Sequence, residues 1–341
     1  MVACKFVLDP DDPFQRKDPS LRGTGSRQDE LEFNMITGQE WAWVDTALQE
    51  AVASDVEILC KASMHILRAG GKRLRPKIVL LSYKAVGGND VTRAVPLAVA
   101  VELLHTASLI HDDINDHSDM RRGRETINTR WGNGLALLVG DFVFVKSLNL
   151  ISTFDPHVIQ VLANCCTAIV EGETSQMLHV GDTRMTEEEY LAILSQKTAS
   201  LMSACGELGG IVAGGTERQI SALKAYGLNL GIAFQIRDDT LDLVGDRDEL
   251  GKPTSNDLDQ GKMSLAALFA IRESEKKGGC LSLKDLQRSP NILDDTGAIE
   301  YAMLKASEYA DMARKALVVL PESEAKVELC GLADFAVTRN R

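Results

Sequence analysis

Apolar residues recur at intervals of three and four along most of the chain after about Gln39, which is the period of one face of an α-helix. Stretches in which apolar and polar residues alternate, as they do in strands, are few. Residues 36–341 are therefore predicted to form one all-α domain, a helical bundle. Residues 1–35 are polar, lack a sustained apolar period and are predicted to be a flexible N-terminal extension. Glycine pairs, which are common at helix ends, are predicted to divide the bundle at Gly70-Gly71, Gly87-Gly88, Gly209-Gly210, Gly214-Gly215 and Gly278-Gly279.

Capping residues predict where two of the helices begin. Thr186–Glu189 has the pattern of a capping box, ahead of a helix that runs toward Glu207. Thr216 with Gln219 has the same pattern, ahead of a helix that runs toward Asp242.

Two stretches, residues 96–116 and 221–243, are apolar almost all round, which is typical of helices inside a protein. Each of them ends in a cluster of aspartates with the spacing DDxxD. One copy of this pattern would be a weak signal, but two copies at the ends of buried helices indicate a function. The six carboxylates are those of Asp112, Asp113 and Asp116 in the first cluster and of Asp238, Asp239 and Asp242 in the second.

The geometry of a helix directs each cluster at one place, because its first and last aspartates are one turn apart on the same face. Like charges at a helix C-terminus repel one another and the helix dipole, and a bound cation removes that cost. Carboxylate oxygens without cysteine ligands select Mg²⁺ or Mn²⁺ over zinc. The clusters are therefore predicted to bind Mg²⁺, with Mn²⁺ as an alternative.

Two other interpretations of the clusters are less favoured. Each could be a solvated helix end, but their number and the cations beside them argue against that. A di-metal oxo site in a helical bundle needs two Glu-x-x-His motifs, and the sequence has one, Glu102 to His105.

Cations gather at four places near the clusters or beside glycines, which is the arrangement expected of a site for phosphate groups. Any one of them alone could be an ordinary exposed cation. The sequence has neither a Walker A motif nor a dinucleotide-binding glycine pattern. The four places hold Lys72, Arg73 and Arg75; Arg121, Arg122 and Arg124; Lys197; and Lys252 with Lys262.

The composition excludes several classes of protein. The net charge of −12 argues against a nucleic-acid partner. The uninterrupted apolar stretches are short, so no transmembrane helix is expected, and the first residues do not resemble an export signal. Seven cysteines at irregular spacing, without CxxC pairs, indicate a reducing cytoplasm and no structural zinc.

Five motifs, in this order and at these separations, closely resemble those of the trans-prenyl diphosphate synthases: GGKRLRP, ELLHTASLIHDDINDHSDMRRG, QKTASL, FQIRDDTLDL and GKPTSNDLDQGK. The resemblance extends from about residue 40 to the C-terminus. It implies the all-α isoprenoid synthase fold around a deep central apolar cavity, usually in a homodimer. It also implies an enzyme that condenses isopentenyl diphosphate with an allylic diphosphate, with up to three Mg²⁺ held by the six aspartates.

The same resemblance implies roles for the other polar residues of these motifs. Arg121, Lys197 and Lys252 are expected to contact the allylic diphosphate, and Lys72, Arg75, His105 and Arg122 the isopentenyl diphosphate. Thr198, Gln235 and Lys262 are expected near the reaction centre.

Product length is expected to depend on the helix that carries the first cluster. A helical wheel places Ser108 beneath Asp112 with Leu104 to one side, and the family pattern adds Ala107. An aromatic residue at Ala107 or Ser108 closes the pocket in short-chain members of the family, and here both are small. A medium- to long-chain polyprenyl diphosphate is therefore expected, with Leu104 or a residue of another helix as the pocket floor.

Three alternatives remain. The enzyme could make a short product, farnesyl or geranylgeranyl diphosphate. A terpene cyclase has the same fold but generally a different second metal motif and no isopentenyl site. A non-catalytic partner subunit could lose its carboxylates, and this chain has all six. No basic amphipathic helix is evident, so at most transient membrane contact is expected.

Overall fold

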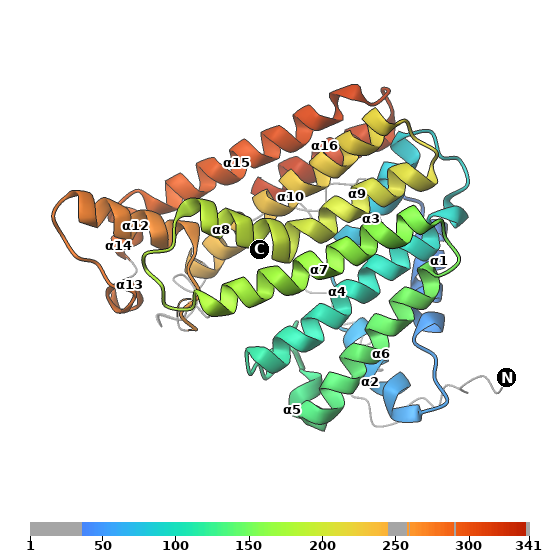
Figure 1. Cartoon of the computed structure of the whole chain (residues 1–341), viewed down its shortest axis with the longest axis horizontal. Coiled ribbons are helices and arrows are strands. Elements are labelled where there is room, and N and C mark those ends of the chain that lie inside the picture. The colour runs from blue at the N-terminus through green and yellow to red at the C-terminus, as the bar shows by residue number, and fades with distance from the viewer. Residues whose placement is uncertain (1–35, 245–257, 259, 290, 339–341) are drawn as a thin grey trace, which may run out of the picture.

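The structure is a computed structural model that describes residues 36–244, 258, 260–289 and 291–338. The predicted all-α class is confirmed, and the predicted extension at residues 1–35 lies outside the described residues. The helices, shown in Figure 1, are α1 (Gly38–Ala51), α2 (Glu57–Leu67), α3 (Leu74–Ala85), α4 (Val95–Asn115), α5 (Ile127–Trp131), α6 (Asn133–Ile151), α7 (Pro156–Leu178), α8 (Glu187–Leu194), α9 (Ser200–Val212), α10 (Glu217–Val244), α12 (Leu265–Lys276), α13 (Leu283–Arg288), α14 (Asn291–Asp295), α15 (Ala298–Ala316) and α16 (Glu324–Thr338).

Short elements complete the described chain. Two 3₁₀ turns, η1 (Val91–Arg93) and η3 (Leu317–Val319), and one π-helical turn, η2 (Ser195–Ala199), adjoin longer helices. After α4, strands β1 (Met120–Arg121) and β2 (Arg124–Glu125) form an antiparallel hairpin.

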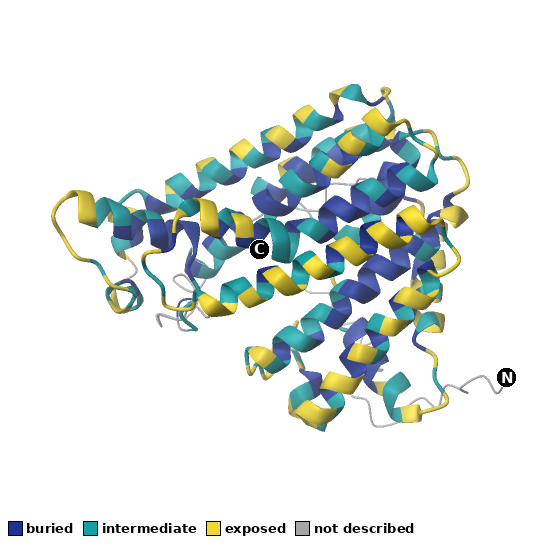
Figure 2. Cartoon of the chain, viewed as in Figure 1, coloured by how far each residue is buried: buried dark blue, intermediate teal, exposed yellow. Residues whose placement is uncertain are grey.

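The core is formed where α3, α4, α9 and α10 pack together, with α6, α15 and α16 around them (Figure 1). Helix α4 is buried along most of its length, as its apolar composition predicts (Figure 2). A second apolar cluster joins α8, α12 and α15 to the end of α10. The two aspartate clusters therefore lie at the ends of helices that the core holds in place.

The predicted helix starts agree with the structure. The Thr186 side chain accepts a hydrogen bond from the Glu189 N–H, and the Glu189 carboxylate accepts one from the Thr186 N–H, which begins α8. Thr216 and Gln219 make the equivalent pair ahead of α10. A third capping box, Thr37 with Glu40, begins α1, close to the predicted start of the fold.

The prediction that Gly209-Gly210 ends a helix is wrong, because both residues lie inside α9. A Cβ at Gly209 would lie 2.5 Å from the Val79 carbonyl oxygen of α3, and one at Gly210 would lie 3.0 Å from Leu223. These glycines allow α9 to pack closely against its neighbours. The predicted continuous helix from Thr186 is also interrupted, by the π turn η2.

Two helical segments are apolar and long enough to cross a membrane, although the short uninterrupted runs predicted none. Val91–Asn115 is 72% buried within the chain, as a core helix is. Asn133–Ile151 is only 33% buried, so α6 presents much of its apolar surface outward.

Candidate active site

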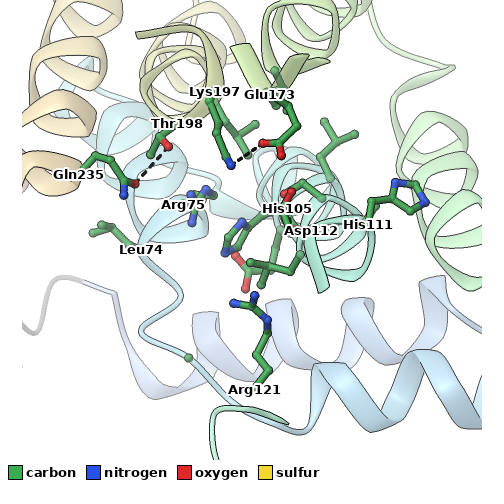
Figure 3. Close-up of a pocket in the computed structure, with 18 of the residues that line it drawn as sticks. Leu74, Arg75, His105, His111, Asp112, Arg121, Glu173, Lys197, Thr198 and Gln235 are labelled. Atoms are coloured by element: carbon green, nitrogen blue, oxygen red, sulfur yellow. Dashed lines mark hydrogen bonds and ion pairs between the residues drawn. The ribbon is translucent and has the colours of Figure 1, made fainter. Parts of the chain in front are cut away.

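A cavity of about 1000 Å³ opens between α3, α4, α7, η2 and α10. Figure 3 shows side chains from all of these elements pointing into the same space. Most of the residues predicted for the site line this cavity: Lys72, Arg75, Leu104, His105, Ala107, Ser108, Asp112, Arg121, Arg122, Lys197, Thr198, Gln235 and Asp238.

The other predicted residues lie just behind the cavity wall or outside the described chain. Asp113 is only 2% exposed and accepts a hydrogen bond from Arg121 Nε at 2.6 Å. Asp116 accepts one from Lys262 Nζ at 2.8 Å. Asp239 accepts hydrogen bonds from two side chains, described below, and Asp242 is one turn beyond Asp238 on α10. Lys252 lies outside the described residues.

Asp112 and Asp238 bring carboxylates to two walls of the cavity, from α4 and α10. Burial raises the pKa of Asp112 to about 6, while the positive charge of Lys197 acts against that rise. Burial also raises the pKa of Asp113, opposed by its ion pair with Arg121. The Asp112 charge is thus held in a place where a cation would stabilise it.

Lys197 and Thr198 enter the cavity from the π turn η2. The Lys197 ammonium pairs with the Glu173 carboxylate and donates to Gln176 Oε1 at 2.7 Å, both on α7 (Figure 3). Burial acts to lower the pKa of Lys197, but Asp112 and Glu173 outweigh it and raise that pKa. The lysine is therefore charged and aimed at the Asp112 side of the cavity.

The opposite side of the cavity carries a group of cations from α3 and the β1–β2 hairpin. The Arg75 Nε is buried and has no hydrogen-bond partner among the described residues. Burial lowers the pKa of Arg75 below its usual value. Burial, and then the charge of Arg75, lower the pKa of His105 well below its usual value, so the imidazole is neutral at pH 7. A desolvated guanidinium beside a neutral donor is suited to bind an anion.

The loop before α3 is fitted to this group of cations. The Arg122 guanidinium donates to the Gly70 carbonyl oxygen, and a Cβ at Gly71 would lie 2.6 Å from Arg122 Nη1. Arg73 also lines the cavity, but its guanidinium is paired with the Glu102 carboxylate at 2.5 Å. The loop and the hairpin are thus joined around Arg122.

Between Leu104 and Asp112, α4 contributes small or apolar side chains to the lining of the cavity, and this part of the lining is called the apolar arm. Its α4 side is formed by the small side chains predicted there, and Ser108 donates to the His105 carbonyl oxygen at 2.9 Å, within its own helix. Residues of two other helices face them across the arm: Phe144 on α6, and Cys166, Ile169 and Val170 on α7.

Sequence reasoning missed Glu173, Gln176 and Phe144. Glu173 and Gln176 contact Lys197, Phe144 lines the cavity, and each lies on a helix without a marked motif. These residues matter because of the distant segments that they face, and a local sequence pattern gives no information about such contacts.

The donor set fits a hard divalent cation. The carboxylates of Asp112 and Asp238 reach the cavity from two helices, α4 and α10, and within the described part of the chain no three His, Cys, Asp or Glu side chains form a ready metal site. A cation here needs further oxygen ligands from a bound molecule, as Mg²⁺ bound to substrate phosphates has. With the cations around it, the cavity can hold anionic groups at one end and an apolar chain in its arm.

Comparisons with known proteins agree with this arrangement. A family model described as polyprenyl synthetase matches residues 56–293. The octaprenyl diphosphate synthase of Escherichia coli K12 is 37% identical over 321 residues, 91% of this chain and 98% of that protein. The short chain isoprenyl diphosphate synthase of Methanothermobacter thermautotrophicus is 38% identical over 310 residues, 86% of this chain and 95% of that protein. A crystal structure of a polyprenyl synthase from Caulobacter crescentus CB15, complexed with calcium and isoprenyl diphosphate, has a TM-score of 0.83 at 34% identity and covers 91% of this chain and 97% of that one.

Proposed function

The chain belongs to the polyprenyl synthetase family and is a prenyltransferase, and from that premise we propose a Mg²⁺-dependent enzyme that condenses isopentenyl diphosphate head-to-tail with an allylic diphosphate and forms a trans double bond. The observation that carries the proposal is the cavity itself. It is lined by the carboxylates of Asp112 and Asp238, by the cations Lys197 and Arg75, and by the apolar arm.

The allylic diphosphate is proposed to lie between the two aspartate clusters. Lys197 and Arg121 neutralise its charge, and Asp112 and Asp238 are the cavity-lining carboxylates that would hold the metal. The Caulobacter crescentus structure, which contains calcium with isoprenyl diphosphate, supports a divalent cation in this role. Mg²⁺, when bound, supplies positive charge that stabilises a departing diphosphate.

Isopentenyl diphosphate is proposed to bind at Lys72, Arg75, His105 and Arg122. Its double bond then attacks the allylic carbon as the carbon–oxygen bond to the diphosphate breaks, a new carbon–carbon bond forms, and a proton is lost to the released diphosphate. No protein nucleophile is required. The apolar arm has to exclude water, which would otherwise capture the allylic cation.

A medium- to long-chain product is proposed because the α4 wall of the arm is built from Ala107 and Ser108. The relatives include both an octaprenyl and a short chain synthase at similar identity, so they do not distinguish product lengths. The small side chains leave open the space that a longer chain needs. Farnesyl or geranylgeranyl diphosphate remains the alternative product.

A homodimer is also proposed, and the outward face of α6 supports it. Large apolar side chains on this helix are exposed, among them Leu137, Leu138 and Val145 (Figure 2). A second copy of the chain would cover such a face in a symmetric dimer.

The test is to incubate the purified protein with Mg²⁺, labelled isopentenyl diphosphate and allylic primers of increasing length, and to read product length by mass spectrometry. The proposal predicts a ladder that ends beyond geranylgeranyl diphosphate, and loss of turnover by several orders of magnitude in Asp112→Ala and Asp238→Ala. Label that stays in isopentenyl diphosphate with every primer, in folded protein, would overturn the activity. A ladder that ends at farnesyl or geranylgeranyl diphosphate would overturn the proposed length.

A further inference from the structure

A chain of hydrogen bonds connects the cavity wall to a tyrosine outside the cavity. Tyr190 Oη donates to Asp239 Oδ2 at 2.5 Å, and Gln235 Nε2 donates to Asp239 Oδ1 at 2.7 Å. Thr198 Oγ1 in turn donates to Gln235 Oε1 at 3.1 Å (Figure 3). Gln235 and Thr198 line the cavity beside Asp238, whereas Tyr190 does not.

Donor and acceptor rules fix the direction of every bond in this chain. An ionised carboxylate only accepts, so both the Tyr190 hydroxyl and the Gln235 amide nitrogen must donate to Asp239. The Gln235 amide then has its oxygen toward Thr198, whose hydroxyl proton points at Gln235. The remaining lone pairs of the Thr198 oxygen are left for a group within the cavity.

Tyr190 is well placed to hold this arrangement. Its side chain is 3% exposed and its ring packs in the apolar cluster of α8, α12 and α15. It lies in the middle of α8, which leads through η2 to Thr198, while Gln235 and Asp239 are one turn apart on α10. Two hydrogen bonds therefore join the segment from α8 to η2 with α10: the one from Tyr190 to Asp239 and the one from Thr198 to Gln235.

A small cavity behind the wall places Tyr190 close to other groups of the site. Gln176, which holds Lys197, and Lys262, which pairs with Asp116, line it together with Tyr190. The tyrosine thus lies behind the predicted diphosphate site and outside the space that substrates can reach.

We propose that Tyr190 is a positioning residue for the prenyl transfer: acting through Asp239 and Gln235, it fixes the Thr198 hydroxyl so that its oxygen accepts toward the cavity. Without the tyrosine hydroxyl, Asp239 has one donor fewer and the Gln235 amide is free to turn over. Thr198 then presents its proton to the cavity, where positive charge develops during the reaction. The inference rests on the proposed function.

The test is a double-mutant cycle between the two ends of the chain of hydrogen bonds. Tyr190→Phe is expected to lower kcat by about 10- to 100-fold, with KM for both substrates changed by no more than about twofold. In a Thr198→Val background, which has no hydroxyl to orient, Tyr190→Phe is expected to leave kcat unchanged. A purely structural role for Tyr190 predicts the same loss in both backgrounds and would overturn the inference.

Tyr301→Phe is the matched control. The Tyr301 hydroxyl donates to Glu187 Oε2 at 2.6 Å, at the first residue of the same helix α8, but it has no contact with the cavity. Its kcat is expected to equal that of the unmodified protein. A loss of kcat like that of Tyr190→Phe would show that any change near α8 has this effect, and would overturn the inference.

A second variant covers the case in which Tyr190→Phe does not fold. Gln235→Leu has no amide, so it breaks the chain of hydrogen bonds between Asp239 and Thr198 and leaves the tyrosine and both aspartate clusters intact. It is expected to lower kcat in a way that again requires the Thr198 hydroxyl, and a loss independent of Thr198 would contradict the inference. Turnover by the unmodified protein is measured first, because its absence would overturn the proposed function instead.

Discussion

The buried position of Asp112 favours the binding of a cation and lowers the stability of the metal-free fold. Burial raises its pKa to about 6 from an ordinary value of 3.8. The folded protein therefore binds this proton more tightly than the unfolded chain does, and stability falls as the pH rises through that interval. A group placed for folding alone would not carry this cost.

Replacing Asp112 with asparagine is expected to stabilise the metal-free protein while it abolishes activity. At about pH 7.5 the free energy of unfolding should rise by about 3 kcal/mol, and the gain should shrink to about 0.5 kcal/mol near pH 4, where the folded protein is protonated and the unfolded chain partly so. The measurement is urea unfolding with a chelator present at the two pH values. Asp45→Asn, at an exposed position on α1, is the control and should change neither value. Equal stability of Asp112→Asn and the unmodified protein at both pH values would contradict the cost of burial.

Ser108 is expected to control product length by its size. A Ser108→Phe variant places a ring in the apolar arm opposite α7, so chain growth should stop earlier and the ladder should end at a shorter product. Ser108→Ala keeps the arm open and should leave the product length unchanged. Both are measured by mass spectrometry of the products, and an unchanged length in Ser108→Phe would show that the chain does not grow along this wall.

At the scale of elements, the contact between α7 and the π turn η2 fixes Lys197. A Cβ at Gly172 would lie 2.5 Å from the Lys197 backbone nitrogen and 2.8 Å from Gln196 Cβ. Only glycine allows α7 to approach this closely, and the approach brings Glu173 to the Lys197 ammonium. A π turn inside a helix commonly marks a functional position, which agrees with the two cavity residues that η2 presents.

Gly172→Ala is expected to separate α7 from η2 and to lower both stability and activity. The free energy of unfolding should fall by about 1–3 kcal/mol, and kcat should fall further than that loss of folded protein explains. Gly134→Ala is the control, because a Cβ there meets nothing within 4 Å and α6 is helical at that residue. Thermal unfolding and turnover together decide the result: a Gly172→Ala protein with full activity would show that Lys197 does not depend on this contact.

The sequence predicts elements where their causes are local. The capping pairs at Thr186 and Thr216 act within four residues, so α8 and α10 begin where expected. Two other features depend on which helix packs against the segment: the π turn η2, and the continuation of α9 through Gly209. A local sequence pattern does not identify that neighbouring helix. The same reason hides Glu173 and Tyr190, whose partners are 24 and 49 residues away along the chain.

At the scale of the whole molecule, the net charge of the chain does not describe the charges around the cavity. The chain carries a net charge of −12, yet six cations of its described part line one cavity: Lys72, Arg73, Arg75, Arg121, Arg122 and Lys197. Over the distances inside a cavity, such local charges outweigh the remote, solvent-screened ones. An acidic protein can therefore gather cations around one cavity, and the motifs predicted such a gathering because they contain the local charges rather than their sum.

The outward face of α6 determines the oligomeric state of the whole molecule if a second copy of the chain covers it. Leu138 is 59% exposed, and only a third of α6 is buried within the chain. If the α6 faces of two copies packed against each other, this apolar surface would be removed from water. Leu138→Glu is therefore expected to convert a dimer into a monomer by placing two like charges, one from each copy, in the pairing. Light scattering after size-exclusion chromatography measures the mass, and Val318→Glu, on the exposed turn η3, is the control that should leave the mass unchanged. A monomeric unmodified protein would refute the dimer, and a dimer that survives Leu138→Glu would place its interface elsewhere on the surface.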